Sequence, residues 1–160
     1  MRDERQAGDH RIMGGAGIDV LQVGGLVSGG ETHTVRLQLG GATTHVVMNG
    51  ATIGSAIGFE ALDLRIFGEA GHSIGGGAHA DRITTGNGGD SISSGGGDDV
   101  VDVSYRGADT VLAGAGNDSV TLVLDRTDRV LLGDGDDLLT AYGIYAGDVL
   151  GAGGGRWGAR

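Results

Sequence analysis

Aspartate recurs at one fixed place in a nine-residue unit that covers residues 76–151 of this chain. Each unit carries Asp at its sixth place and an aliphatic residue at its eighth. The sixth-place residues are Asp81, Asp90, Asp99, Asp109, Asp118, Asp128, Asp137 and Asp148, and the eighth-place residues are Ile83, Ile92, Val101, Val111, Val120, Val130, Leu139 and Leu150. An isolated copy lies upstream at residues 14–22. Regularly spaced carboxylates are the oxygen ligands that hard divalent cations prefer, so the pattern predicts cation binding.

A second period of two units is superposed on the first. Single extra residues, Val103 and Leu122, follow every second unit, so Asp99, Asp118 and Asp137 stand 19 residues apart. The first four places of the units that begin at 94, 113 and 132 are rich in glycine, whereas Tyr105, Arg106, Leu124 and Arg126 take glycine places in the alternate units. Two units therefore form one physical coil with two unlike sides.

These units need a short turn and a short strand to position the aspartates. We expect a glycine-rich turn of about six residues, because glycine adopts the positive φ angles of tight turns. A strand of about three residues follows, with its eighth-place aliphatic side chain facing inward. Strands one coil apart then stack in parallel around a narrow aliphatic interior. The predicted fold is all-β, a right-handed β-solenoid with two nonapeptide units per coil.

The units resemble the calcium-binding nonapeptide repeats of RTX (hemolysin-type) proteins, whose pattern is G-G-x-G-x-D-x-U-x. Residues 14–22 match every fixed place, and the units at 94–102, 113–121 and 132–140 miss only the first glycine. Residues 58–62, Gly-Phe-Glu-Ala-Leu, are similar to the lead-in that often precedes such arrays. The resemblance implies a parallel β-roll in which Ca²⁺ lies between stacked turns, held by the sixth-place aspartates and by glycine carbonyls.

Carried over to this chain, the resemblance implies a set of calcium ligands. The best-matched are Gly95, Gly97, Asp99, Gly114, Gly116, Asp118, Gly133, Gly135 and Asp137, followed by Asp81, Gly86, Gly88, Asp90 and Asp109. The turns at 104–109 and 123–128 have lost glycines of the pattern, so the sequence leaves open whether they bind metal. The number of ions also stays open.

A row of carboxylates makes folding depend on a cation. Two such charges about 5 Å apart repel by roughly 3 kcal/mol at an effective dielectric of about 20. Ca²⁺ accepts six to eight oxygens in flexible geometry, whereas Mg²⁺ demands tighter octahedra and Zn²⁺ favours His or Cys. Three or four sites at tenfold excess of Ca²⁺ over Kd would stabilise the fold by about 4–6 kcal/mol. We therefore expect a chain that is largely disordered without Ca²⁺ and folds with it.

Composition excludes several other classes of protein. The chain has 160 residues, 36 of them Gly, with no Pro and no Cys, so disulfide scaffolds, cysteine metal sites and collagen are ruled out. The net charge of −10 argues against nucleic-acid and anionic-membrane partners, and no apolar stretch is long enough to span a membrane. The five His residues lack zinc-site spacing and no G-x-S-x-G elbow occurs, so we expect no enzyme activity.

The pattern divides the chain into four parts. We expect a flexible lead at 1–13, irregular β coils at 14–75, the calcium-binding β-roll at 76–151 and a Gly-rich tail at 152–160. A small separate β-domain before the roll is the alternative for the second part. Trp157 either caps the open end of the stack or is exposed.

The predicted function is calcium binding by a folding and structural module of a secreted, extracellular bacterial protein. The charged N-terminus does not begin a cleaved secretory signal peptide. This agrees with the one-step secretion that the resemblance implies. One alternative is an adhesive or matrix protein that binds polysaccharide through Arg106, Arg126 and Arg129, and another is a fragment of an exported hydrolase or carbohydrate-active enzyme. An ice-binding face is disfavoured because its threonines, Thr84, Thr85, Thr110, Thr121 and Thr140, are not expected in register. Open solenoid ends also permit self-association.

Overall fold

The computed structural model describes residues 10–13, 15–26, 35–38, 44–48, 51–57, 59–125, 127–143 and 146–153. All regular structure in these ranges is β-strand, so they contain no helix that could cross a membrane. The strands are β1 His10–Met13, β2 Val20–Leu26, β3 Val35–Gln38, β4 Thr44–Met48, β5 Ala51–Ile57, β6 Ala61–Phe67, β7 Ser73–Gly75, β8 Arg82–Thr84, β9 Ser91–Gly96, β10 Val100–Val103, β11 Thr110–Ala115, β12 Ser119–Val123, β13 Arg129–Asp134, β14 Leu138–Tyr142 and β15 Val149–Gly151.

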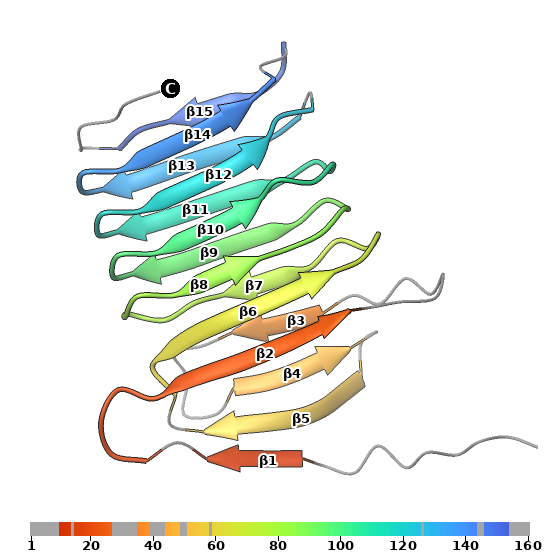
Figure 1. Ribbon diagram of the computed structural model, residues 1–160, viewed down its shortest axis with the longest axis vertical. Helices are drawn as coiled ribbons and strands as arrows, with labels where there is room; N and C mark the ends of the chain where they lie inside the picture. Colours follow the sequence, from red (N-terminus) through yellow and green to blue (C-terminus); the bar gives the residue numbers. More distant parts are fainter. Residues whose placement is uncertain are drawn as a thin grey trace, which may run out of the picture.

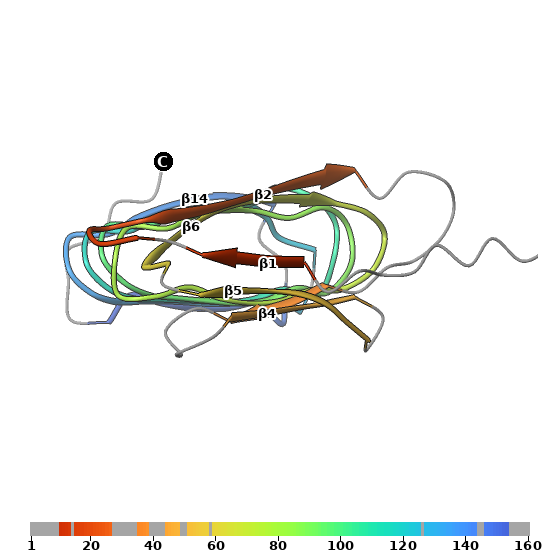
Figure 2. The same ribbon diagram turned by 90° about the horizontal axis from the view of Figure 1, so that it is seen from below.

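The strands form two sheets that face each other as the layers of a solenoid (Figures 1 and 2). The nine-stranded sheet has the order β1-β5-β4-β3-β7-β9-β11-β13-β15, and the six-stranded sheet has the order β14-β12-β10-β8-β6-β2. From β6 to β15 the chain passes alternately through the two sheets, and every pairing there is parallel. This arrangement confirms the predicted parallel β-roll with two units per coil.

The strand register keeps equivalent residues of successive coils side by side. In the six-stranded sheet Val101 lies opposite Val120, and Val120 lies opposite Leu139. In the nine-stranded sheet Ile92 lies opposite Val111, and Val111 lies opposite Val130. The 19-residue period of the sequence is thus the length of one coil.

The interior is wider than the sequence indicated. The eighth-place residues other than Leu150 are buried as expected, with Ile83, Val111, Val120 and Val130 fully enclosed. A second buried row lies two residues further along each strand, because strands such as β11 run to six residues rather than about three. That row contains Thr85, Val103 and Leu122 in one sheet and Ser94, Ala113 and Leu132 in the other. In the units that begin at 85, 94, 113 and 132, the first place is therefore not glycine, because its side chain fills the core.

The N-terminal part shares its sheets with the roll. The sequence placed residues 10–13 in a flexible lead, but they form β1, which pairs in parallel with β5. Strands β3, β4 and β5 pair antiparallel and extend the nine-stranded sheet, while β2 pairs with β6 over seven residues. Regular stacking also starts before the expected boundary at residue 76, since β6 pairs with β8 and β7 with β9.

The threonines are better aligned than the sequence suggested. Thr84, Asp102, Thr121 and Thr140 occupy one row across the six-stranded sheet, so the expectation that these threonines are out of register was wrong. The row is single and Asp102 interrupts it, because the outward neighbours on β10, β12 and β14 are Val100, Ser119 and Leu138. It does not form a flat threonine face.

Candidate metal centre

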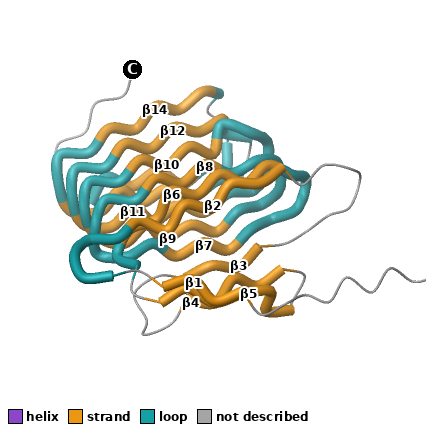
Figure 3. Tube along the Cα trace, turned by 60° about the horizontal axis from the view of Figure 1, so that its bottom comes forward, coloured by secondary structure: helices purple, strands orange, loops and turns teal. Residues whose placement is uncertain are grey.

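The turns that join the two sheets stack along two opposite edges of the solenoid (Figure 3). We call the edge made by turns 76–81, 94–99, 113–118 and 132–137 the first edge, and the edge made by turns 85–90, 104–109, 123–128 and 143–148 the second edge. The sixth-place aspartates divide between them. The first ladder comprises Asp81, Asp99, Asp118 and Asp137, and the second ladder comprises Asp90, Asp109, Asp128 and Asp148.

Backbone hydrogen bonds hold the carboxylates of each ladder in a stack. In the first ladder the N–H of Asp81 donates to Oδ1 of Asp99 at 2.8 Å, and the N–H of Asp99 donates to Oδ1 of Asp118 at 2.9 Å. The N–H of Asp118 donates in turn to Oδ1 of Asp137 at 3.0 Å. The second ladder repeats this bond, with N–H to Oδ1 distances of 2.8 Å from Asp90 to Asp109 and 2.7 Å from Asp109 to Asp128. One oxygen of each of these acceptors is thus committed to the fold.

The second oxygen of several of these carboxylates is buried without a hydrogen bond. This is the case for Oδ2 of Asp90, Asp99 and Asp118, whose residues are at most 2% exposed. A buried carboxylate oxygen without a partner costs free energy unless a cation or a proton satisfies it. These atoms are therefore the strongest indication of a cation site.

Burial also disfavours the charged form of these side chains. It raises the pKa of Asp90 and of Asp99 to about 6, and the carboxylates of Asp118 and Asp81 add to the effect on Asp99. Burial, followed by the nearby charges of the second ladder, raises the pKa of Asp109 to about 7. Burial also raises the pKa of Asp118 above its ordinary value. A positive charge from outside the chain would therefore favour the ionised form of Asp90, Asp99, Asp109 and Asp118.

Glycines of the first edge bring backbone carbonyls close to the ladder. Gly114 and Gly116 have φ angles of 115° and 137°, in the region that other residues rarely adopt. A Cβ on Gly114 would overlap the carbonyl oxygen of Gly95, and a Cβ on Gly116 would overlap that of Gly97. The carbonyls of one turn therefore point at the next turn, and only glycine leaves room for them.

The donors at the first edge are all oxygens, which fits Ca²⁺. Each pair of adjacent turns offers carboxylate oxygens and glycine carbonyls in a setting that a flexible coordination sphere accepts. Within the described residues no three His, Asp or Glu side chains converge on one point, so carbonyls must complete any site there. A set of carboxylates and carbonyls without His or Cys does not suit Zn²⁺.

The second edge differs from the first. Leu124, which takes a glycine place in the turn at 123–128, is buried in the core, and Asp128 Oδ2 accepts a hydrogen bond from the Asp125 N–H at 2.8 Å. Tyr105 occupies the corresponding place one coil earlier and packs edge-on against Phe67, with ring centroids 5.9 Å apart. Gly88 retains a positive φ of 103° in the turn at 85–90. Apolar packing thus replaces glycine at Leu124 in the turn at 123–128, whereas a Cβ on Gly107 would still overlap the Gly88 carbonyl oxygen and Gly147 keeps a positive φ of 122°.

The structure sorts the ligands implied by the resemblance between these edges. The first edge brings together Gly95, Gly97, Asp99, Gly114, Gly116, Asp118, Gly133, Gly135, Asp137 and Asp81, and the second edge holds Gly86, Gly88, Asp90 and Asp109. Asp81 already has both oxygens bonded, since Oδ1 accepts from the Leu62 N–H at 2.6 Å and Oδ2 from the Gly77 N–H at 2.8 Å. The role of all these residues as calcium ligands stays a prediction.

Sequence reasoning missed a third ladder at the fifth place of the first-edge units. The N–H of Asn117 donates to Oδ1 of Asp98 at 2.8 Å, and the N–H of Asp136 donates to Oδ1 of Asn117 at 2.9 Å. These side chains are exposed and satisfied by the neighbouring coil. The sequence does contain a sign of this ladder, because Asp or Asn directly precedes three of the sixth-place aspartates.

Comparison with protein-family models gives a match to this region. Residues 75–104 and 105–121 match the RTX calcium-binding nonapeptide repeat in four copies. This segment is similar to RTX repeats. The match spans the coils that carry Asp81, Asp90, Asp99, Asp109 and Asp118. The RTX repeat is a structural calcium-binding module, which suggests calcium binding by the matched segment. Neither the curated proteins nor the solved structures gave a match to the chain.

Proposed function

We propose that this chain is a module that binds several Ca²⁺ ions along its first edge and folds as it binds them. The observation that carries the proposal is the pair of buried, partnerless Oδ2 atoms of Asp99 and Asp118, in consecutive turns of the RTX segment. Each carboxylate uses Oδ1 for the adjacent coil and keeps Oδ2 for a cation. The ion supplies the positive charge that makes stacking of ionised ladders favourable.

Three stretches of the first edge would hold the ions. Between the turns at 94–99 and 113–118, the ligands would be Asp99, Asp118 and the glycine carbonyls beside them. The same arrangement repeats between the turns at 113–118 and 132–137, with Asp137 as the second carboxylate. The turn at 76–81 is a weaker candidate, because both oxygens of Asp81 accept backbone hydrogen bonds.

On the second edge we place at most one site, at Asp90. Its Oδ2 has no partner and Gly88 has the positive φ of a cradle glycine, as on the first edge. At Asp128 the neighbouring Asp125 N–H already occupies the second oxygen. We therefore assign most of the metal binding to the first edge, since apolar packing replaces glycine at Leu124 of the second edge and Asp128 has no free oxygen.

We also propose that the module belongs to a secreted bacterial protein, the setting typical of RTX repeats. The acidic net charge of −10 agrees with a protein whose working partner is a dication present outside the cell. Extracellular calcium modules have Kd values of about 10⁻⁴–10⁻³ M. Binding in that range would leave the chain unfolded inside a cell and folded into the solenoid outside it.

The polysaccharide-binding alternative is not favoured by the arrangement of the arginines. Arg106 lies in a turn of the second edge, whereas Arg129 begins β13 in the nine-stranded sheet, and Arg126 lies outside the described residues. Arg106 also stands level with Asp125, because Asp109 and Asp128 share a register. The two described arginines do not form a basic face. No observation favours an exported hydrolase over a calcium module.

A far-UV circular dichroism titration of the full chain with Ca²⁺ tests the proposal. We expect a gain of strand signal at millimolar or lower Ca²⁺, and a much weaker response to Mg²⁺ at the same concentration. Asp99→Asn should shift the midpoint to higher Ca²⁺, because it removes a charged oxygen between two turns. A strand signal that is absent at all Ca²⁺ concentrations, or that responds equally to Mg²⁺, would contradict it.

A further inference from the structure

Residues 87 and 88 form an Asn-Gly pair in a turn of the second edge. The chain has three Asn residues, Asn49, Asn87 and Asn117, and Gly follows the first two. An Asn side chain before Gly is prone to ring closure, because glycine has no Cβ to hinder the approach of its backbone nitrogen to the side-chain amide. The pair at 87–88 is therefore a candidate site of spontaneous deamidation.

The backbone of one residue in the next coil holds both reacting groups of this pair. The Gly88 N–H donates to the Arg106 carbonyl oxygen at 2.8 Å, and the Arg106 N–H donates to Oδ1 of Asn87 at 3.2 Å. From the other side, Oε1 of Glu69 accepts a hydrogen bond from Nδ2 of Asn87 at 2.9 Å. The side-chain amide is thus fixed between the previous coil and the next one. Ring closure requires these bonds to break.

The fold itself requires glycine at position 88. The φ angle of Gly88 is 103°, and a Cβ there would lie 2.5 Å from the carbonyl carbon of Ala70. A bulkier residue that slowed ring closure would therefore disrupt the turn. The roll keeps a reactive pair and protects it by stacking.

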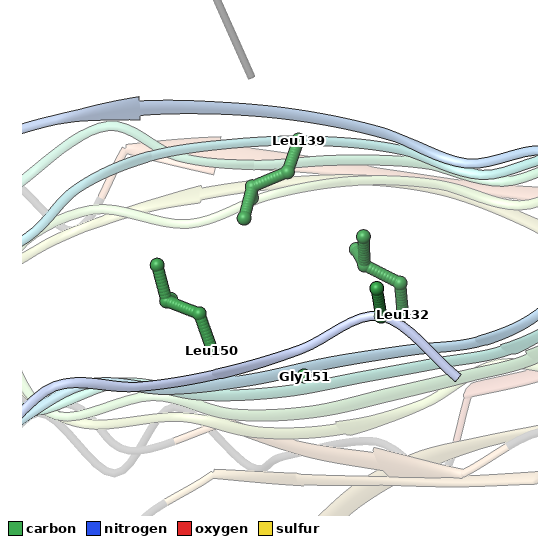
Figure 4. A pocket seen from close by; sticks show the side chains of 5 residues that line it. Leu132, Leu139, Leu150 and Gly151 are labelled. Carbon is green, nitrogen blue, oxygen red and sulfur yellow. The ribbon is translucent and has the colours of Figure 1, made fainter. Parts of the chain in front are cut away.

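The protecting turns lie within the stack, away from its C-terminal end. A coil at the end of a solenoid has only one neighbour and opens more readily. At the C-terminal end Leu132, Leu139 and Leu150 line an apolar hollow between the sheets (Figure 4), and Leu150 is 40% exposed. Whether Trp157 covers this end stays a prediction, because it lies outside the described residues. Three further turns of the second edge separate Asn87 from this end, so opening of the last coil leaves it protected.

We propose that Asn87 is a site of spontaneous deamidation that the folded roll protects and the unfolded chain exposes. In the reaction the Gly88 nitrogen attacks Cγ of Asn87, the Cγ–Nδ2 bond breaks, and ammonia leaves with the proton of the Gly88 nitrogen. Water then opens the resulting succinimide. Cleavage of the bond between the nitrogen and Cγ gives Asp, and cleavage of the bond between the nitrogen and the main-chain carbonyl carbon gives isoaspartate.

Both products fit the turn less well than Asn does. The Asp product keeps an acceptor for the Arg106 N–H, but it loses the donor to Glu69 and sets two carboxylates side by side. Isoaspartate adds a methylene to the main chain of a turn that backbone hydrogen bonds tie to the next coil. Deamidation therefore records the time that a chain spends unfolded and hinders its later folding. That this is the time spent without Ca²⁺ rests on the proposed function.

Peptide mapping of the full chain by mass spectrometry tests the proposal, because cleavage after Arg places each Asn in a separate peptide. The chain is aged at neutral pH in saturating Ca²⁺, in chelator and in urea. In urea we expect Asn87 to react at the rate of Asn49, which also precedes Gly, and faster than Asn117, which precedes Asp. In Ca²⁺ the reaction of Asn87 should be slower by about tenfold or more, because it requires the roll to open. The chelated chain should behave as in urea.

Gly107→Ala tests the protection within the folded chain in Ca²⁺. A Cβ at position 107 would overlap the carbonyl oxygen of Gly88, so the variant pushes apart two turns that meet beside Asn87. We expect faster deamidation of Asn87 than in the parent. Gly96→Ala is the matched control, since the nearest atom to an added Cβ there is 3.7 Å away. It should keep the parent rate.

Asn87→Gln separates damage at this site from damage elsewhere. Gln would have to close a larger and less favourable ring, so the variant aged in urea reacts chiefly at its other Asn residues. After transfer from urea to Ca²⁺, the aged parent should regain less strand signal than the aged variant, each relative to its own fresh sample.

Each other outcome overturns part of the proposal. An unreacted Asn87 in urea, where Asn49 reacts, would remove the site. Equal rates in urea and in Ca²⁺, for a chain with strand signal in Ca²⁺, would overturn the protection. Equal recovery of the aged parent and Asn87→Gln would overturn the effect on folding. A chelated chain that keeps its strand signal and protects Asn87 would contradict the proposed function and leave the site standing.

Discussion

The backbone N–H of Asp99 donates to Oδ1 of Asp118, 19 residues later and one coil further along, at 2.9 Å. This bond uses one oxygen of Asp118 to fix the stacking of two coils. It leaves Oδ2 of the same carboxylate buried without a hydrogen bond. One side chain thereby sets the spacing of the turns and offers a charged oxygen between them, so that folding and cation binding depend on the same residue.

Asp118→Asn separates these two roles. The amide oxygen still accepts the N–H of Asp99, but the second position becomes an uncharged donor that cannot ligate Ca²⁺. We expect the variant to bind fewer Ca²⁺ ions per chain by isothermal titration, while its fully loaded form keeps the parent circular dichroism. Asp128→Asn is the matched control, because Asp128 Oδ2 is already bonded to the Asp125 N–H. Equal ion counts for Asp118→Asn and the parent would contradict the assignment.

Gly114→Ala tests the glycine cradle of the first edge. Gly114 has a φ of 115°, and its missing Cβ leaves room for the Gly95 carbonyl oxygen. We expect a loss of at least about 1–3 kcal/mol in the free energy of unfolding, together with weaker Ca²⁺ binding. Urea unfolding in saturating Ca²⁺ measures the first effect.

Gly96→Ala is the control for that variant. Gly96 lies in the preceding turn of the first edge, has no positive φ, and the nearest atom to an added Cβ is 3.7 Å away. Its stability should stay close to that of the parent. Equal losses for both variants would mean that glycine at these places has no special role.

The metal-free chain should gain strand structure as the pH falls. Burial raises the pKa of Asp90 and Asp99 to about 6 and that of Asp109 to about 7, above the ordinary value of 3.8. The folded state therefore binds more protons than the unfolded state between these limits, and the free energy of unfolding falls as the pH rises through about 6–7.

Circular dichroism in excess chelator, at about pH 5 and about pH 8, checks this prediction. We expect more strand signal and a higher thermal midpoint at the lower pH. Ca²⁺ affinity should change in the opposite direction, because protons compete with the ion for the same carboxylates. A metal-free chain that is more ordered at the higher pH would contradict the raised pKa values.

Leu122→Ala tests the second interior row. Leu122 is fully buried and lies opposite Val103 in the neighbouring coil. Removing a buried Leu side chain costs about 2–5 kcal/mol, partly through the cavity that it leaves. Urea unfolding in Ca²⁺ should show this loss. The adjacent Thr121→Ala should change stability by less than about 1 kcal/mol, because Thr121 belongs to the outward row. A small loss at Leu122 would contradict the two-row interior.

Much of the fold could be predicted because the period of the sequence equals the period of the structure. The 19-residue spacing of Asp99, Asp118 and Asp137 predicts stacked coils, and the ladder bonds join residues at that spacing. The alternation of glycine-rich and glycine-poor turns likewise predicts two unlike edges. Because these features repeat along the chain, the sequence pattern alone predicts them.

Other features depend on contacts that the pattern does not contain. A nine-residue frame treats Val103 and Leu122 as insertions, although both fill the core, because strand length was set by packing between sheets. The antiparallel β4–β5 pair has no counterpart in the repeat. Whether an aspartate keeps an oxygen for a cation depends on backbone N–H groups nearby, as the contrast between Asp118 and Asp128 shows.

Isothermal titration of the chelated full chain with Ca²⁺, followed in parallel by far-UV circular dichroism, tests most directly whether the aspartate ladders need a cation to stack. The account predicts binding of several ions per chain and a rise of strand signal over the same range of Ca²⁺ concentration. A chelated chain that already resists protease, shows full strand signal and gives no heat of binding when Ca²⁺ is added would contradict it.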